Sequence, residues 1–200
     1  SLTPGGGSVT ILEELESCGF ILKTPQFEKK KQDSRYRLID AFSLFYLKWV
    51  EDIGEVSESY WIRKKGSPEY SVWAGYAFEN VCFQHYDKII RALELTVTAE
   101  SKSSWKFIAP KDTEENGAQI DLVIDRSDKC INLCEIKFYG SEFTVVKEYS
   151  EKLLFKKSCF LEKTNTKKTL FTTMITTYGV KKNSRYYESV DSQITMDALF

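Results

Sequence analysis

Several features that would point directly to a function are missing from this sequence. Among its 200 residues there is one histidine, His85, and no serine or cysteine pattern typical of a nucleophile accompanies it. A catalytic-triad hydrolase is therefore poorly supported. No apolar run approaches the roughly 18–20 residues that span a bilayer, and the N-terminus lacks the plan of a signal peptide. We expect a cytoplasmic protein.

Cysteine is present, but not in a pattern that builds a framework. The five cysteines are odd in number and scattered along the chain: Cys18, Cys82, Cys130, Cys134 and Cys159. A disulfide framework is not expected from this distribution, and reduced thiols are the simpler interpretation. Cys130 and Cys134 are close together, but no second Cys/His pair follows at the spacing of a zinc site, which disfavours structural zinc.

Charge of one sign is also absent as a global feature. The formal net charge is −1 and the pI is about 6.0, so any affinity for nucleic acid must come from local basic clusters. A hydrophobic content of 42% with 14% aromatic residues is enough for one substantial core or two small ones. We therefore expect folded domains and not a disordered chain.

The first part of the chain predicts a small module of one helix and two strands. Thr10 and Glu13 have the spacing of a capping box, which indicates a short helix that Gly19 ends. Apolar residues at 20–22 and alternating residues at 36–38 predict two strands on either side of a polar stretch. Helix, strand, loop and strand are the last elements of a winged helix, so we expect a partial winged-helix module.

Two roles for this module, residues 1–66, remain open. In the first, Lys29, Lys30 and Lys31 at the tip of the wing contact nucleic-acid phosphates. In the second, the module is a protein-protein spacer, because its helix is acidic and its basic and acidic side chains are equal in number.

A connecting helix and a turn divide the chain in two. Asp40 is expected to cap an apolar helix over 41–50, whose aromatic side chains would hold the two halves together. The turn-forming residues 66–68 then mark the boundary. We place a second domain over 67–200.

The second domain is expected to open with a helix over 72–91. One polar stripe of this helix contains Asn80, Gln84, Asp87 and Arg91. A mainly apolar flank contains Val72, Gly75, Cys82 and Tyr86. Glu79 falls on the apolar flank, where a carboxylate needs a cation or a hydrogen-bond donor. The alternative is a glutamate at the rim that reaches water or pairs with a nearby lysine.

The most informative segment, 117–138, predicts two strands joined by a polar turn. Alternation assigns faces to three sets of residues: Ile120, Leu122 and Ile124; Asp121, Val123 and Asp125; and Ile131, Leu133, Glu135 and Lys137. If Asp125 pairs with Ile131 across the turn, Asp121 lies opposite Glu135. A slip of one residue would abolish this arrangement.

Two carboxylates that face each other among apolar neighbours repel, and a divalent cation resolves the repulsion. Mg²⁺ accepts oxygen ligands from one or two carboxylates together with waters and phosphate. Lys137 would project beside Asp121 and Glu135, where its ammonium can hold a water and offset charge on a phosphate oxygen.

These residues resemble the signature of the PD-(D/E)XK phosphodiesterase superfamily. Asp121 matches the acidic residue of the first strand, the tripeptide 135–137 matches acidic-X-Lys on the next, and Glu79 matches the glutamate of the preceding helix. The resemblance implies an α/β domain with a restriction-endonuclease-like mixed sheet flanked by helices. It also implies a Mg²⁺- or Mn²⁺-dependent nuclease for DNA or RNA. Asp121, Glu135 and Glu79 would hold the metal, and Asp121, Glu135 and Lys137 would be catalytic.

A wider resemblance, over nearly the whole chain, is to the C-terminal region of bacterial and archaeal AAA-type ATPases of uncharacterised role. It is carried by five ordered blocks: 36–40, 75–79, 119–123, 134–138 and 170–179. The chain has no GxxxxGK[ST] loop, so the ATP-binding part would lie upstream in a longer chain. An alternative is then a catalytically inactive nuclease-like domain that regulates this ATPase or binds DNA or protein.

The sequence departs from the superfamily pattern at two places. Ile120 replaces the proline that gives the motif its name. The basic helix expected over 145–160 has no glutamine of the kind that some exonuclease-like members carry, although it offers Lys152 for nucleic-acid binding. A strand over 169–178 and a last element over 193–200 complete the prediction.

Overall fold

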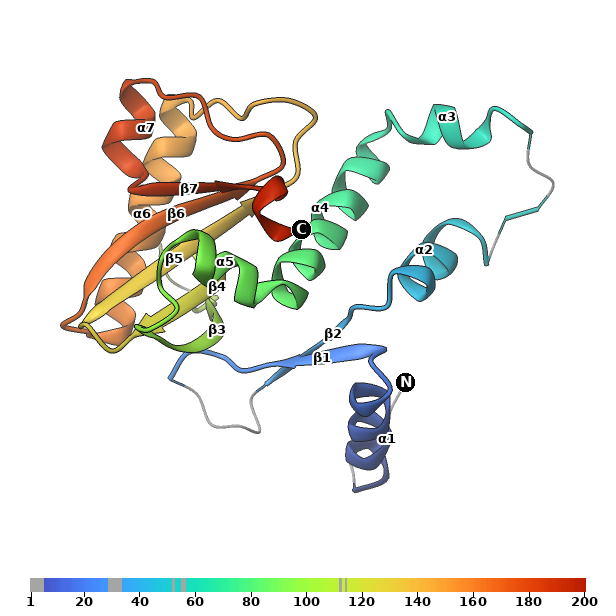
Figure 1. The fold of residues 1–200 in the computed structure, drawn as a ribbon, viewed down its shortest axis with the longest axis horizontal. Helices are drawn as coiled ribbons and strands as arrows, with labels where there is room; N and C mark the ends of the chain where they lie inside the picture. The colour runs from blue at the N-terminus through green and yellow to red at the C-terminus, as the bar shows by residue number, and fades with distance from the viewer. Residues whose placement is uncertain (1–5, 29–33, 52, 55–56, 112, 114) are drawn as a thin grey trace.

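The computed structural model describes residues 6–28, 34–51, 53–54, 57–111, 113 and 115–200. It is an α/β structure with a five-stranded mixed sheet flanked by helices and a separate two-stranded sheet (Figure 1). Its elements are α1 Gly6–Ser17, β1 Ile21–Thr24, β2 Arg35–Leu38, α2 Ala41–Trp49, α3 Tyr60–Lys64, α4 Pro68–Gln84, α5 Tyr86–Ala92, β3 Ala99–Phe107, β4 Ala118–Arg126, β5 Cys130–Lys137, α6 Lys147–Thr164, β6 Thr169–Thr176, α7 Ser184–Ser189, β7 Ser192–Thr195 and the 3₁₀ helix η2 Met196–Leu199.

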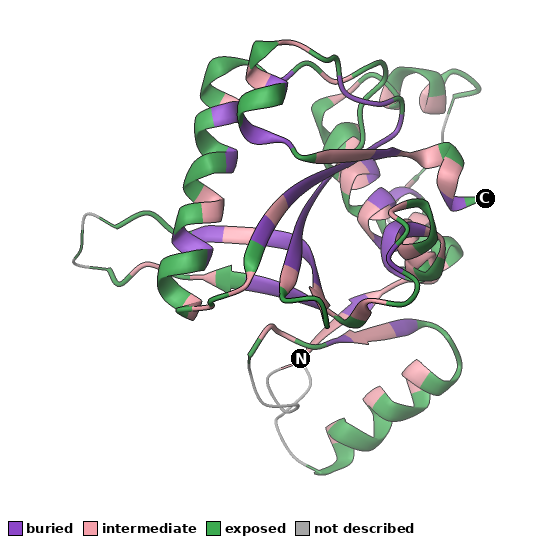
Figure 2. Ribbon diagram, turned by 60° about the vertical axis from the view of Figure 1, so that its left-hand side comes forward, coloured by how far each residue is buried: buried purple, intermediate pink, exposed green. Residues whose placement is uncertain are grey.

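The large sheet has the strand order β3-β4-β5-β6-β7. Its first three strands are antiparallel, whereas β5, β6 and β7 run parallel and are connected through α6 and α7. One face packs on α4, α5 and η2, and the other on α6 and α7. Figure 2 shows the central strands largely buried, while α1 has no buried residue. The α/β class with a mixed, helix-flanked sheet is therefore as predicted.

The N-terminal elements agree with the prediction except at the start of α1. Gly19, with φ +77°, follows the last turn of this helix, and β1 and β2 form the expected antiparallel pair. The capping box at Thr10 is wrong, because α1 already includes Gly6. Thr10 lies inside the helix, and its hydroxyl donates to the Gly6 carbonyl (3.3 Å) as a helical side chain does.

The connecting helix α2 is capped by Asp40 as predicted, since its carboxylate accepts a backbone N–H of the first turn at 2.7 Å. Aromatic rings then join three helices. Phe45 and Trp49 of α2 each contact both Trp61 of α3 and Trp73 of α4, with ring centroids 5.1–6.1 Å apart. The contacts agree with the expected role of α2 between the two halves of the chain.

The single helix predicted over 72–91 is wrong, because the segment forms two helices. α4 begins at Pro68, where the Ser67 side chain caps the first turn, and it ends before His85. His85 has non-helical dihedral angles (φ −98°, ψ 31°), so α5 starts in a new direction. A stripe calculated for one straight helix cannot continue across this break.

Three of the four residues of the predicted polar stripe are exposed, and Asn80 is the exception. Asn80 is buried and donates to the Leu38 carbonyl (2.6 Å), and Gln84 donates to the Ile39 carbonyl (3.0 Å). Val72, expected on the apolar flank, is 76% exposed. Asn80 and Gln84 make these bonds because the end of β2 lies against this side of α4, where the free backbone carbonyls need donors.

The predicted faces of β4 are wrong at Ile120. Ile120 packs with Val123 in the core on the α6 side, whereas Leu122 and Ile124 belong to the core on the α4 side. Between Ser103 and Trp105 of β3 the register shifts, so that β4 carries one extra residue. This β-bulge exchanges the faces of the residues that precede it.

The remaining elements are close to expectation, with two additions. α6 starts two residues later than predicted and extends to Thr164, β6 ends at Thr176, and the last element is β7 followed by η2. β3 and α7 were not predicted, and neither was α3, described above. All five cysteines are free thiols. In the part of the chain that the structure describes, no helix has the length and apolarity needed to cross a membrane.

Candidate functional site

The strand register at the hairpin is the predicted one. Asp125 pairs with Ile131, and the antiparallel ladder continues to Leu122 opposite Cys134. Asp121 and Glu135 are the next positions along the two strands, and there the bulged β4 leaves the ladder. The backbone N–H of Ile136 donates instead to Asp121 Oδ2 at 3.0 Å. The Asp121 carboxylate thus takes the place of a backbone acceptor beside Glu135.

Glu135 is held by three donors. Its side chain is 5% exposed. Lys156 Nζ of α6 lies 2.5 Å from Oε2, Lys137 Nζ lies 3.1 Å from Oε1, and the Tyr149 hydroxyl donates to Oε1 at 3.1 Å. Both carboxylate oxygens are therefore neutralised by cations at hydrogen-bonding distance.

The two carboxylates have opposite electrostatic environments. Burial, then the charges of Glu135 and Glu79, raise the pKa of Asp121 from 3.8 to about 6. Burial also acts to raise the pKa of Glu135, but Lys156 and Lys137 outweigh it and bring the pKa below its usual value. The pKa of Lys137 is raised: burial opposes the shift, but Glu135 and Asp121 stabilise the ammonium.

A cavity of about 510 Å³ opens over Asp121 and Glu135. Lys106, Lys137, Lys152 and Lys156 line it, from the ends of β3 and β5 and from one side of α6. The remaining lining residues are Phe107, Ile108, Ala109, Gly117, Ala118, Gln119 and Phe155. Two acidic groups beneath four ammonium groups form a surface suited to a cation and a phosphate together.

The carboxylate of Glu79, which was expected to need a cation or a donor, is paired with an arginine and not with a lysine. Arg37 of β2 donates to Glu79 Oε2 at 2.9 Å, and its guanidinium lies 4.7 Å from the ring centroid of Phe83. Glu79 does not line the cavity, but its charge contributes to the raised pKa of Asp121. It belongs to the electrostatic surroundings of the site.

The expected nucleic-acid ligands divide into two groups. Lys152 is exposed on α6 and lines the cavity. Lys29, Lys30 and Lys31 lie outside the residues that the structure describes.

Four residues of the site were missed from the sequence: Lys106, Lys156, Tyr149 and Arg37. Lys156 and Lys152 are four residues apart on α6 and so share a face, which was a usable signal once Lys152 was chosen. No local pattern connects Tyr149 with Glu135 or Arg37 with Glu79, since those contacts depend on how the elements pack.

The donor set suits a hard divalent cation. Asp121 Oδ1 has no hydrogen-bond partner within the described ranges, and it belongs to a carboxylate that lines the cavity. Mg²⁺ typically uses one or two protein carboxylates and completes its shell with waters and phosphate oxygens. Asp121 and Glu135 can supply two such ligands, provided that a lysine ammonium yields one oxygen of Glu135. Over the same ranges, no group of three or more Asp, Glu, His or Cys side chains is arranged so that it could hold a metal ion.

Comparison of the chain with protein-family models, with curated proteins and with solved structures found no match.

Proposed function

We propose that this chain is a metal-dependent phosphodiesterase that acts on DNA or RNA through a PD-(D/E)XK nuclease-like domain. The observation that carries the proposal is the cavity in which Asp121 and Glu135 lie beneath four lysines. The helix-flanked mixed sheet agrees with a restriction-endonuclease-like architecture. By the resemblance described above, the chain would be the C-terminal part of a longer ATPase.

The two acids and Lys137 each have a role in this proposal. Asp121 and Glu135 would hold Mg²⁺ or Mn²⁺, with Glu79 adding negative charge nearby. The metal supplies Lewis acidity toward the phosphate and a more acidic bound water. Lys137, 35% exposed, faces the cavity beside both acids, where it can orient the attacking water and donate to a phosphate oxygen.

Lys156 keeps Glu135 ready to bind a cation. Its ammonium, with that of Lys137, lowers the pKa of Glu135, so the group remains a carboxylate at neutral pH in spite of its burial. Lys156 is thus a positioning residue for Glu135 in the absence of substrate. With a phosphate in the cavity, the same ammonium can turn to the phosphate, since it lines the cavity.

The test is cleavage of labelled single- and double-stranded DNA and RNA in Mg²⁺ or Mn²⁺. The wild-type chain should cleave at least one substrate, and Glu135→Ala should eliminate cleavage. Lys147→Ala is the matched control, because Lys147 is on the first turn of α6, is 66% exposed and does not line the cavity. Absence of cleavage with every substrate and metal, from folded protein, would overturn the proposal.

A second function is favoured by one observation. Lys156 and Lys137 already compensate both oxygens of Glu135, so the site is electrically balanced there without a metal. A catalytically inactive domain that docks on the ATPase or on DNA would keep this arrangement. Calorimetric titration with Mn²⁺ discriminates the two: heat from the wild type that Asp121→Ala lacks supports the nuclease, and no heat from either supports the inactive domain.

A further inference from the structure

The β1–β2 hairpin is fastened to the edge strand of the large sheet. The Phe27 N–H donates to the Ser104 carbonyl at 2.9 Å, and the Ser104 N–H donates to the Pro25 carbonyl at 3.0 Å. The Phe27 ring packs 5.1 Å from the ring centroid of Phe160 on α6. Backbone hydrogen bonds and ring packing together fix the position of β2, and of its Arg35, relative to β3.

A second cavity, of about 430 Å³, opens along this seam. Gln26 and Arg35 line it from the hairpin, and Lys163 lines it from α6. Residues 105–108, which are the end of β3 and the residue after it, line it from the sheet. It shares Lys106 and the two residues after it with the cavity over Asp121 and Glu135. The two hollows therefore adjoin at the end of β3, and one extended ligand can occupy both.

The cations along this path differ in whether an acid neutralises them. Lys163 lies 3.1 Å from Glu115 and 2.9 Å from Glu162. Arg35, Lys106 and Lys152 have no ion-pair partner among the residues that the structure describes. Three unpaired cations along adjoining hollows, in a chain with net charge −1, form a local site for a polyanion.

Apolar side chains lie between these cations. Ile108 is 74% exposed and Phe155 39% exposed, and both line the cavity over the two acids. Phe107 lines both hollows. Duplex DNA presents mainly phosphates to a groove of this kind, whereas a single strand also presents unstacked bases, which pack on apolar and aromatic side chains.

We propose that the seam between the β1–β2 hairpin and β3 is a binding subsite for single-stranded nucleic acid. Arg35 and Lys106 bind phosphates one or more nucleotides away from the phosphate held over Asp121 and Glu135. This subsite rests on the proposed function, because it places the rest of the same substrate. It also gives the N-terminal hairpin a direct part in substrate binding.

The test measures binding without cleavage. Fluorescence anisotropy would follow a labelled single strand of about 16 nucleotides, in EDTA, with the wild-type chain, Arg35→Gln and Lys106→Gln. Each substitution should weaken binding about tenfold and reduce the salt dependence of log K by about 0.7, the value for one lost phosphate contact on a single strand. A strand of about 4 nucleotides can fill only one hollow, so its affinity should fall less on the same substitutions.

Controls match the charge that is removed. Arg63→Gln and Lys147→Gln remove a cation from α3 and from the exposed start of α6, and binding should stay at the wild-type level. Thermal unfolding checks that each variant is folded. If Arg35→Gln unfolds, Lys106→Gln carries the test, because Lys106 is exposed at the end of its strand.

Two results would overturn the subsite: wild-type binding of the long strand by both variants, or duplex DNA that binds as tightly and with the same dependence on Arg35. The outcome is separable from hydrolysis. If binding depends on Arg35 but the chain never cleaves nucleic acid, the result supports the subsite and contradicts the proposed nuclease activity. Cleavage of long strands at the wild-type rate by Arg35→Gln keeps the nuclease and removes the subsite.

Discussion

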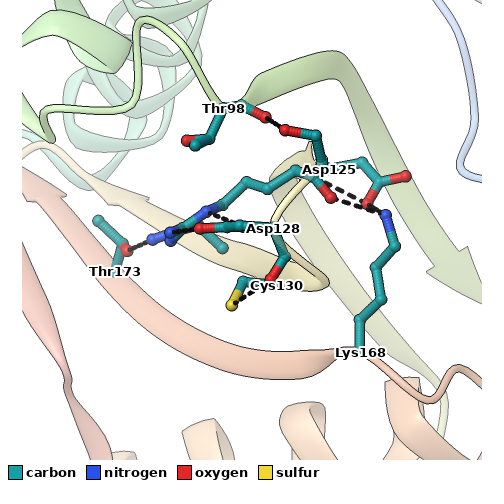
Figure 3. A network of polar contacts seen from close by, with 9 residues as sticks. Thr98, Asp125, Asp128, Cys130, Lys168 and Thr173 are labelled. Carbon is teal, nitrogen blue, oxygen red and sulfur yellow. Dashed lines mark hydrogen bonds and ion pairs between the residues drawn. The ribbon is translucent and has the colours of Figure 1, made fainter.

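The two ends of the β4–β5 hairpin both carry acidic side chains, but they differ in whether every acid has an ion-pair partner. At the turn, Lys168 lies 2.5 Å from Asp125 and also donates to the Arg126 carbonyl, while the Arg126 guanidinium binds Asp128 (Figure 3). The hydrogen bonds from Arg126 bring the pKa of Asp128 below its usual value. Each acid at the turn has its own cation.

At the opposite end, Asp121 is held by one backbone N–H and faces a second buried acid. Its pKa moves upward, where that of Asp128 moves downward. A carboxylate that is paired in the fold stabilises it, whereas a buried carboxylate without a cation costs stability that a ligand can recover. The comparison separates the structural end of the hairpin from the end at which we propose the catalytic site.

The largest effect is expected on activity. Lys137→Ala should lower the cleavage rate by about 10²-fold or more, since it removes a cation beside the reacting phosphate. Asp128→Asn, at the turn, should leave the rate unchanged. Rates under single-turnover conditions check both variants. Equal losses in the two would mean that the hairpin acts only as scaffold.

Metal binding should stabilise the protein through the Asp121 end of the β4–β5 hairpin and not through the turn. Mn²⁺ at about a hundredfold excess over its Kd should raise the free energy of unfolding of the wild type by about 2.7 kcal/mol. Asp128→Asn should show the same increase, and Asp121→Asn should show none. Urea unfolding with and without Mn²⁺ measures it. A similar increase in Asp121→Asn would place the metal elsewhere.

Without metal, Asp121→Asn should make the protein more stable at pH 7. A raised pKa means that the charged form is disfavoured in the fold, and a shift from 3.8 to about 6 corresponds to a gain on the order of 3 kcal/mol. The amide can still accept the Ile136 N–H. The exposed Asp197→Asn is the control, with no expected change.

The same gain should depend on pH in a defined direction. The folded-state pKa of Asp121 lies above its usual value, so the stability from its neutral form is complete below about pH 4 and is lost as pH rises through 6. The advantage of Asp121→Asn should therefore vanish near pH 4 and be full at pH 7. Urea midpoints across this range test it, and an advantage independent of pH would point to packing and not to charge.

The smallest effect is expected at the turn. Lys168→Ala removes the partner of Asp125 and one bond to the Arg126 carbonyl, in a half-buried place, and should lower the free energy of unfolding by about 1 kcal/mol. Lys167→Ala, on the exposed neighbouring lysine, should change little. If both variants unfold alike, the turn end does not depend on this pair.

Local patterns predicted much of the fold where the signal lies within one element or one hairpin. The cap at Asp40, the stop at Gly19 and the β4–β5 register each depend on residues close in sequence. Predictions failed where a contact with another strand or helix changed the local structure. The bulge that moves Ile120 exists only in the pairing with β3, and the burial of Asn80 depends on β2 lying against α4.

The sequence by itself predicted the β4–β5 register, in which Asp121 and Glu135 follow the last paired residues of the ladder, because a short polar turn and the pairing of Asp125 with Ile131 are local features. Only the tertiary structure decided what surrounds them. Lys156 and Tyr149 of α6 contact Glu135, and Arg37 of β2 pairs with Glu79 of α4. The partners in each contact are far apart in the sequence. Packing of distant elements selects such partners, and it sets whether each buried acid is paired or left to bind a cation.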